Sequence, residues 1–233
     1  MNHIAALMNP RVSIVLPVFN RSHLVMRAIQ SVERQLFPDW ELLIIDDGSS
    51  DGLEQLILPR LASEPRWRYF KHTNRKLAAS RNIGITAALG RLVTFLDADD
   101  EYLPEHLQLR VHYLQAHPHI QLIHGGAIFQ GPEESHWVED AYQPGQLIHL
   151  SECIIGATLF GYKQVFAATG GFKLVSYSAE SELVARLEKI YTVRRVDFPT
   201  YIYYTGLPDS ICTQKKNENL PLQRREKGKR EVV

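Results

Sequence analysis

Residues 93–100 have the sequence VTFLDADD, an apolar, β-type run that ends in three carboxylates within four positions. Asp97 and Asp99 are two positions apart, and side chains with this spacing in extended backbone project to the same side. Like charges held together cost free energy unless a cation or a ligand offsets them. Hard oxygen ligands in small number suit Mg²⁺ or Mn²⁺, which share their sites with waters and substrate phosphates. The run predicts either a metal–diphosphate site at the end of a strand or a solvated acidic turn before a helix that begins near Pro104.

The sequence before this run alternates between short apolar strands and amphipathic helices. We predict strands at 12–18, 40–45 and 67–71, and helices from residue 22, up to about residue 61, and over 76–89. Short links between such elements are typical of a parallel, doubly wound sheet with right-handed crossovers. The fold class predicted is therefore α/β, with a mostly parallel central sheet flanked by helices. Ligands of such sheets bind beyond the carboxyl ends of the strands.

The second half of the chain is less regular. An apolar helical stripe follows the acidic run, and a Gly-Gly-Phe turn at 170–172 precedes a further predicted helix. From residue 215 the sequence is polar and basic, which predicts a loose tail that is either a solvated terminus or a contact to a membrane surface or partner. The further predicted elements are strands at 120–129, 157–162, 193–196 and 201–204, a loop at 131–145, and a helix at 179–189.

Composition excludes several classes of protein. The chain has 233 residues and a formal net charge of zero, so charge gives no general attraction to nucleic acid or to an anionic membrane. Cys153 and Cys212 lack a paired spacing, so neither a disulfide framework nor a cysteine zinc site is expected. We find no N-terminal leader pattern and no apolar run near the roughly 20 residues that span a bilayer. We expect a cytoplasmic protein, at most peripheral to the inner face of a membrane, with no transmembrane segment.

Polar and turn-forming residues gather at the carboxyl ends of three predicted strands. Residues 17–20 follow the first strand, Asp46 and Asp47 follow the second, and residues 97–100 follow the fourth. Because these ends meet at one edge of a parallel sheet, we expect the three groups to form one constellation.

Four motifs then occur in order: VSIVLPVFN at 12–20, IIDDGSSD at 44–51, ASRNIG at 79–84 and FLDADD at 95–100. Together they resemble the family 2 glycosyltransferases with the GT-A fold, and the resemblance covers about residues 11–205. It implies one GT-A (Rossmann-like) domain, with a nucleotide-sugar-binding half at 11–129, an acceptor-side half at 147–205, and a polar, basic tail at 206–233. It also implies a hexosyltransferase-type enzyme that moves a sugar from a nucleotide-sugar donor, usually a UDP-sugar, with a divalent metal, Mn²⁺ or Mg²⁺, and usually with inversion.

The resemblance gives roles to residues in the first two motifs. Pro17, Val18 and Phe19 would form the shelf for the nucleobase, where an aromatic face can stack a base. Asp47 would accept a hydrogen bond from the uracil imide. Asp46 is the weaker candidate for this contact and would instead orient the turn.

The other two motifs would handle the diphosphate and the metal. Lys76 and Arg81 begin the third predicted helix, where positive side chains and a helix N-terminus both favour anions. Asp97, with Ala98 beside it, would face the ribose or the metal. Asp99 would ligate the metal that bridges the two phosphates and stabilises the departing nucleoside diphosphate.

The second half departs from the family pattern at two places. Members commonly carry Glu-Asp near the start of the helix after the Gly-Gly-Phe turn, with the aspartate as general base. Alignment on that turn places Ala179 and Glu180 there, so Glu180 is the predicted base, ahead of Glu182. The arginine and histidine that many members carry after the late tyrosine strand are absent from residues 203–208.

These departures leave a non-catalytic nucleotide-sugar-binding module of the same fold as the main alternative. A nucleotidyltransferase is disfavoured because residues 19–22 lack a glycine-rich, basic phosphate loop. An oxidoreductase is disfavoured because the Gly-x-Gly-x-x-Gly turn is absent there. The acceptor, whether saccharide, lipid-linked or protein, is left open, as are the sugar, the linkage and the oligomeric state.

Overall fold

The computed structural model describes residues 10–143, 145–175, 178–213 and 223–224. By its internal contacts the chain divides into two compact units, Met1–Ile128 with Ile154–Tyr203, and Phe129–Cys153 with Tyr204–Val233. Most of the predicted basic tail lies outside the described residues. The predicted division into donor and acceptor halves stays a prediction.

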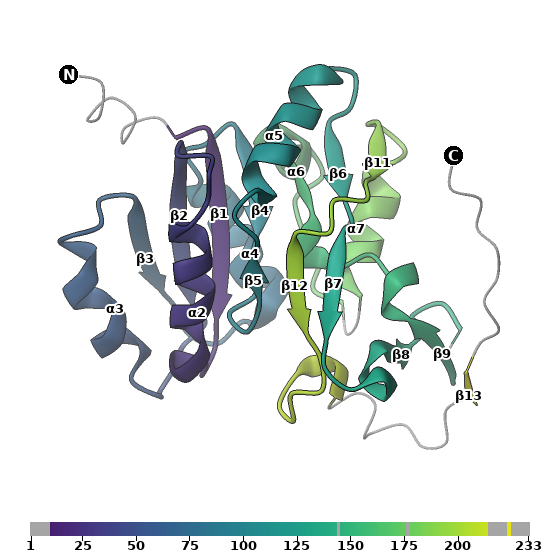
Figure 1. Cartoon of the computed structure of the whole chain (residues 1–233), viewed down its shortest axis with the longest axis horizontal. Helices are drawn as coiled ribbons and strands as arrows, with labels where there is room; N and C mark the ends of the chain where they lie inside the picture. The colour runs from purple at the N-terminus through teal and green to yellow at the C-terminus, as the bar shows by residue number, and fades with distance from the viewer. Residues whose placement is uncertain (1–9, 144, 176–177, 214–222, 225–233) are drawn as a thin grey trace. The chain divides into compact units, whose positions relative to one another are not determined.

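The first unit contains a seven-stranded, mostly parallel sheet, which confirms the predicted fold class (Figure 1). Its strand order is β11-β6-β10-β4-β1-β2-β3. Only β10 runs antiparallel to its neighbours β4 and β6. The strands are β1 (Val12–Val18), β2 (Trp40–Asp46), β3 (Trp67–Lys71), β4 (Leu92–Phe95), β6 (Leu122–His124), β10 (Phe160–Tyr162) and β11 (Val193–Arg195).

Helices cover both faces of this sheet because its strands are apolar on both sides. Successive β1 residues alternate between two cores: Ile14 packs with one cluster of helices and Val15 with the other. The first core receives α2 (Ser22–Glu33), α3 (Leu53–Leu61) and α5 (His106–Ala116). The second receives α4 (Lys76–Ala87), α6 (Lys163–Ala168) and α7 (Ala179–Leu187). The strand–helix alternation therefore gives the layered fold expected from the sequence.

The prediction of one strand over 120–129 is wrong. The strand breaks after β6, because Gly125 and Gly126 adopt φ values of +103° and +75°. A side chain at Gly126 could not be accommodated, since a Cβ atom there would lie 2.1 Å from the carbonyl oxygen of Phe198. The chain continues as β7 (Ala127–Gln130) in a different, three-stranded sheet of order β5-β12-β7, with β5 (Glu101–Tyr102) and β12 (Tyr201–Tyr204).

The predicted loop at 131–145 contains regular structure that the sequence did not indicate. A 3₁₀ turn, η1 (Glu133–His136), leads directly into β8 (Trp137–Glu139). Strand β8 pairs antiparallel with β9 (Gln146–His149), and β13 (Gln223–Arg224) pairs parallel with β9. The predicted strand at 157–162 is shorter than expected, because its first residues form the 3₁₀ turn η3 (Gly156–Thr158). Another 3₁₀ turn, η2 (Leu150–Glu152), follows β9.

The sequence predicts neither a disulfide framework nor a membrane-spanning segment. No disulfide joins Cys153 or Cys212 to a described residue. Within the described ranges, no helix combines the length and the apolar character that a membrane span needs.

Candidate active site

The turn after β2 is held by Asp46, whose carboxylate is fully buried. Its Oδ1 atom accepts a hydrogen bond from the backbone N–H of Ser49 at 2.7 Å, and its Oδ2 atom accepts one from the Tyr69 hydroxyl. Burial, and then this contact with Asp46, raises the pKa of Tyr69, so the phenol remains a donor. Asp46 is thus engaged on both oxygens, and its predicted role in orienting the turn stays a prediction.

Asp47 links the end of β1 to the loop before α4. Its backbone N–H donates to the carbonyl of Val18 at 2.8 Å, and its Oδ1 atom accepts from the backbone N–H of Arg75 at 2.7 Å. The Nδ1 atom of His72 lies 3.4 Å from the same oxygen. The side chain is 6 % exposed, so its position is fixed by the protein.

Phe19 follows β1 and is 45 % exposed, while Pro17 and Val18 are buried within the strand. Of the three predicted shelf residues, Phe19 is therefore the one with an open aromatic face. The neighbouring Asn20 has φ +52°, and its side-chain oxygen accepts from the backbone N–H of Ser50 at 2.9 Å. The sequence placed Asn20 at this turn but gave it no separate role, although asparagine is among the few residues that tolerate positive φ at a turn.

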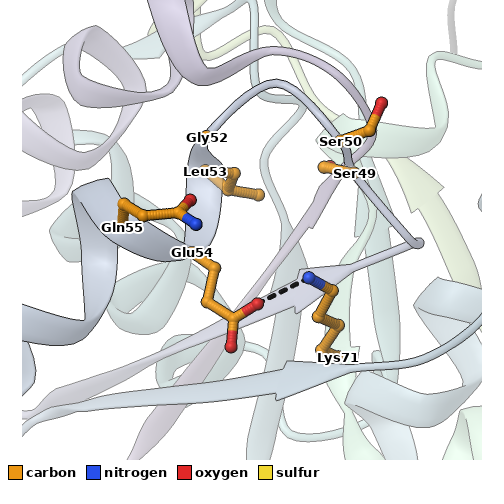
Figure 2. Close-up of a pocket in the computed structure, with 7 residues that line it drawn as sticks. All are labelled: Ser49, Ser50, Gly52, Leu53, Glu54, Gln55 and Lys71. Atoms are coloured by element: carbon orange, nitrogen blue, oxygen red, sulfur yellow. Dashed lines mark hydrogen bonds and ion pairs between the residues drawn. The ribbon is translucent and has the colours of Figure 1, made fainter.

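A small open pocket of about 360 Å³ lies beside this turn (Figure 2). The ammonium group of Lys71, at the end of β3, contacts the carboxylate of Glu54, in the first turn of α3, at 2.6 Å. The pocket is lined by polar groups and backbone of Ser49, Ser50, Gly52, Leu53, Glu54, Gln55 and Lys71.

The acidic run after β4 forms a compact turn that is tied to β12. The backbone N–H of Asp100 donates to the carbonyl of Asp97 at 3.1 Å. The hydroxyl of Tyr201 donates to Oδ2 of Asp100 at 2.6 Å and accepts from the backbone N–H of Asp97 at 3.3 Å. Sequence reasoning missed Tyr201, because no local pattern indicates that β12 reaches this turn.

The remaining two residues of the run differ in exposure. Ala98 is buried. The side chain of Asp99 is 21 % exposed, and its Oδ2 atom lies 3.6 Å from Nε of Arg21. Arg27 also donates to the backbone carbonyl of Asp99. Two cations therefore surround Asp99, which reduces the charge repulsion within the acidic run.

The buried Arg81 forms an ion pair with the partly exposed Asp97. One guanidinium nitrogen of Arg81 lies 3.0 Å from Oδ1 and 3.4 Å from Oδ2 of Asp97, and the Arg81 side chain is 3 % exposed. Burial lowers the pKa of Arg81, but the carboxylates of Asp97 and then Glu180 raise it by more. Nε of Arg81 is buried and has no hydrogen-bond partner among the described residues. The guanidinium thus offers an unused donor close to two carboxylates.

Glu180 and Glu182 have different environments although both lie in the first turn of α7. Burial raises the pKa of Glu180, and the Asp97 charge adds to this, while the Arg81 charge opposes it. Glu182 instead binds Nζ of Lys173 at 2.8 Å and Nε of Arg186 at 2.8 Å. Burial raises the pKa of Glu182, but these cations lower it by more. Glu180 is therefore the carboxylate of α7 that shares the charged cluster with Arg81 and Asp97.

The motif at 79–84 positions this cluster by three separate contacts. Arg81 binds Asp97, as described. The amide of Asn82 donates to the carbonyl of Phe172 at 2.7 Å and accepts from its N–H at 2.8 Å, which ties α4 to the Gly-Gly-Phe turn. Gly84 lets α4 approach β1, because a Cβ atom there would lie 2.2 Å from Cγ1 of Val15. Arg81, Asn82 and Gly84 thus each have a separate packing or polar function.

Lys76 is not brought into the cluster. It is exposed, has φ +71° at the first position of α4, and its ammonium group makes no hydrogen bond or ion pair with the described residues. The structure therefore brings together Arg81, Asp97 and Glu180, with Asp99 on the same turn as Asp97. The donor set of Asp97 and Asp99 suits Mg²⁺ or Mn²⁺, which need only one or two carboxylates beside phosphate oxygens and water.

Residues 13–183 match a protein-family model described as "Glycosyl transferase family 2". A GalNAc(5)-diNAcBac-PP-undecaprenol beta-1,3-glucosyltransferase of Campylobacter jejuni is 38 % identical over 96 residues, which cover 40 % of this chain and 31 % of that protein. An uncharacterized glycosyltransferase of Nostoc sp. is 28 % identical over 214 residues, which cover 89 % of this chain and 63 % of that protein. The chain thus spans only part of the length of these curated relatives.

Solved structures of similar fold include S. aureus TarS 1–349 in complex with UDP-GlcNAc, with a TM-score of 0.67 and 18 % identity, covering 88 % of this chain and 60 % of that one. They also include the mannosyltransferase PcManGT from Pyrobaculum calidifontis in complex with GDP-Man and Mn²⁺, with a TM-score of 0.67 and 18 % identity, covering 84 % of this chain and 57 % of that one. These likenesses confirm the GT-A fold predicted from the sequence.

Proposed function

The chain belongs to glycosyl transferase family 2, and we propose that it transfers a sugar from a UDP-sugar to an acceptor hydroxyl with inversion at the anomeric carbon. One observation carries this proposal: Arg81, Asp97 and Glu180, from α4, the turn after β4 and the start of α7, share one charged cluster. The family relationship supports the reaction class. The acceptor, whether a saccharide, a lipid-linked sugar or a protein, is left open.

The choice of a uridine nucleotide rests on Phe19 and Asp47. An exposed aromatic ring offers a face for stacking a base. The backbone N–H of Arg75 holds the Asp47 carboxylate in place through Oδ1. A carboxylate fixed in this way can accept a hydrogen bond from the N–H of the uracil imide. Two of the similar structures are complexes with uridine nucleotides, UDP and UDP-GlcNAc, and one is a complex with GDP-Man.

We assign Asp97 and Asp99 as the protein ligands of a Mn²⁺ or Mg²⁺ ion. Such an ion, when bound with the donor, supplies positive charge that stabilises the departing diphosphate. Arg81 holds Asp97 in place, and its positive charge favours an anionic group nearby. Lys76, exposed at the start of α4, is the weaker candidate for a diphosphate contact.

Glu180 is assigned as the general base. It would take the proton of the acceptor hydroxyl while the acceptor oxygen bonds to the anomeric carbon and the bond from that carbon to the diphosphate oxygen breaks. A carboxylate whose pKa is raised by burial is a stronger base than an ordinary glutamate, so long as it is ionised at the working pH. Glu182 is unsuited to this role because Lys173 and Arg186 already hold its carboxylate.

The test compares Glu180→Gln with Glu182→Gln, a matched change two positions along the same helix. We expect Glu180→Gln to lower turnover of UDP-sugar by at least about a hundredfold with donor affinity nearly unchanged, because the interaction acts in the transition state. Glu182→Gln is expected to lower stability and leave turnover within a few-fold of the wild type. UDP release measures turnover, and calorimetric titration of UDP with Mn²⁺ measures binding.

Three outcomes separate the hypotheses. If both variants lose turnover but still bind the donor, the result would contradict the assignment of Glu180 alone as the general base. Turnover retained in Glu180→Gln, with chemistry rate-limiting, would assign the base to another carboxylate. Donor binding without turnover in the wild type, across a panel of nucleotide sugars and acceptors, would favour the non-catalytic binding module.

A further inference from the structure

The second compact unit contains a cluster of metal-ligand side chains that the transfer reaction does not use. Glu133, His136 and His149 each offer one ligand atom, and these three atoms lie within 4.8 Å of one another. All three residues belong to the segment Phe129–Cys153 of that unit. No other group of this kind occurs among the residues that the structure describes.

The local fold explains why the two histidines converge. His136 is the last residue of η1, directly before β8. In the antiparallel pair of β8 and β9, Trp137 stands opposite His149, so His136 and His149 are near neighbours at one end of this small sheet. Their ring centroids are 5.9 Å apart. Glu133, three residues before His136, brings a carboxylate oxygen to 3.3 Å from Nδ1 of that ring.

Aromatic packing and a hydroxyl fix the orientation of the imidazoles. The ring centroid of Phe129 lies 5.7 Å from that of His136 and 6.0 Å from that of His149. The ring centroid of Trp137 lies 5.3 Å from that of His149. Nδ1 of His149 lies 2.6 Å from Oγ of Ser151. The same Nδ1 atom accepts from the backbone N–H of Ser151 at 3.1 Å, so Ser151 holds this ring through both its backbone and its hydroxyl.

A second observation concerns the free ring nitrogen of His136. Nε2 of His136 is buried and has no hydrogen-bond partner among the described residues. A buried polar atom without a partner is costly unless water or an ion satisfies it. A simple ion pair of Glu133 with His136 would explain neither this atom nor the approach of His149. A bound cation would explain the convergence of all three side chains.

We propose that Glu133, His136 and His149 form a transition-metal site that binds Zn²⁺. Two imidazoles and one carboxylate are the protein ligands typical of zinc sites with an open fourth position for water, whereas Mg²⁺ and Mn²⁺ prefer oxygen ligands. Zinc holds nitrogen and oxygen ligands at about 2.0–2.2 Å, so ligand atoms now up to 4.8 Å apart must close slightly. Glu133, which is 76 % exposed, can rotate to do so. The ion would link η1 to β9 within the small sheet.

The test is a titration of the full chain, without any histidine tag, with Zn²⁺ in competition with a chromophoric chelator. Because Zn²⁺ can also bind paired aspartates, the titration uses the Asp97→Asn/Asp99→Asn background. We expect one equivalent of Zn²⁺ to bind in that background, and Co²⁺ to give the intense visible absorption of a four-coordinate site. Glu133→Gln and His149→Gln should each weaken binding at least about tenfold. His112→Gln, at an exposed histidine of α5, is the matched control and should change nothing.

If a histidine variant does not fold, Glu133→Gln still tests the proposal, because the exposed Glu133 side chain makes few contacts that folding needs. The proposal is overturned if Zn²⁺ binding in the Asp97→Asn/Asp99→Asn background is absent. It is equally overturned if that binding is unaffected by Glu133→Gln and His149→Gln.

Discussion

Replacing Tyr201 by phenylalanine removes one hydroxyl from the turn that carries Asp97 and Asp99. That hydroxyl donates to Asp100 at 2.6 Å and accepts from the Asp97 backbone at 3.3 Å. Tyr201 and Asp100 are 0 % and 2 % exposed, so water cannot replace the lost group. Burial, and then the Asp100 charge, raises the pKa of Tyr201 well above its ordinary value, so the hydroxyl stays a donor at every working pH.

The expected loss of stability is large for one hydroxyl because its acceptor, Asp100, is charged. A hydrogen bond to a charged group contributes about 1.5–3 kcal/mol to stability. For a chain of this length each kcal/mol corresponds to about 2–4 °C in Tm. We therefore expect Tyr201→Phe to lower the free energy of unfolding by about 2 kcal/mol and Tm by about 4–8 °C. UDP binding in Mn²⁺ should weaken several-fold, because the turn that presents Asp97 and Asp99 is held less firmly.

The assay is a double-mutant cycle of Tyr201→Phe and Asp100→Asn in urea unfolding. The cycle isolates the pair from the other contacts that Asp100 makes. Tyr191→Phe is the control for loss of a phenolic hydroxyl, since the Tyr191 hydroxyl has no hydrogen-bond partner among the described residues and should give little change. A coupling energy below about 0.5 kcal/mol would refute the assigned bond.

Four further outcomes can be measured. Asp99→Asn should abolish metal-dependent UDP binding and leave the circular dichroism spectrum unchanged; UDP affinity that survives excess chelator would contradict the metal assignment. UDP should bind more tightly than CDP by about 1–3 kcal/mol, because cytosine presents an acceptor to Asp47, and calorimetry showing equal affinities or preference for GDP would remove Asp47 from this role. Burial, and then the Arg195 charge, lowers the pKa of His124 from 6.5 to about 4. Between these pH values the unfolded chain therefore binds a proton that the folded chain does not, so the free energy of unfolding should fall as pH falls from 6.5 to about 4. His124→Leu should flatten this pH dependence in urea unfolding. Gly84→Ala should cost about 1–3 kcal/mol, because the added Cβ would lie 2.2 Å from Cγ1 of Val15, whereas Thr86→Ala on the exposed side of α4 should cost far less.

Local sequence patterns predicted the framework of the first half of the chain well. Strand β1 and the acidic ends of β2 and β4 follow directly from apolar runs bounded by turn residues. Such runs are informative because a strand buried on both faces needs apolar side chains at every position, and that requirement acts locally. Asp46, Asp47 and Asp97 could therefore be assigned to strand ends from sequence alone.

Short elements of the second half were not predictable in this way. The strand predicted over 120–129 was wrong because the pattern shows apolar character but not the turn at Gly125 and Gly126, which the approach of Phe198 requires. Strand β8 was missed because it has three residues and owes its conformation to pairing with β9. In both cases a contact distant in sequence decided the local backbone.

What the sequence by itself determined was the α/β fold class and the identity of the acidic turns, since both depend on patterns within a few residues. Only the tertiary structure decided which charged side chains meet. Tyr201 reaches Asp100 across 101 positions of sequence, and Glu180 joins Arg81 and Asp97 from a different helix. The structure likewise separated Glu180 from Glu182, because the pKa of a carboxylate depends on burial and on nearby charges. Those neighbours are set by packing between distant segments, which local periodicity does not encode.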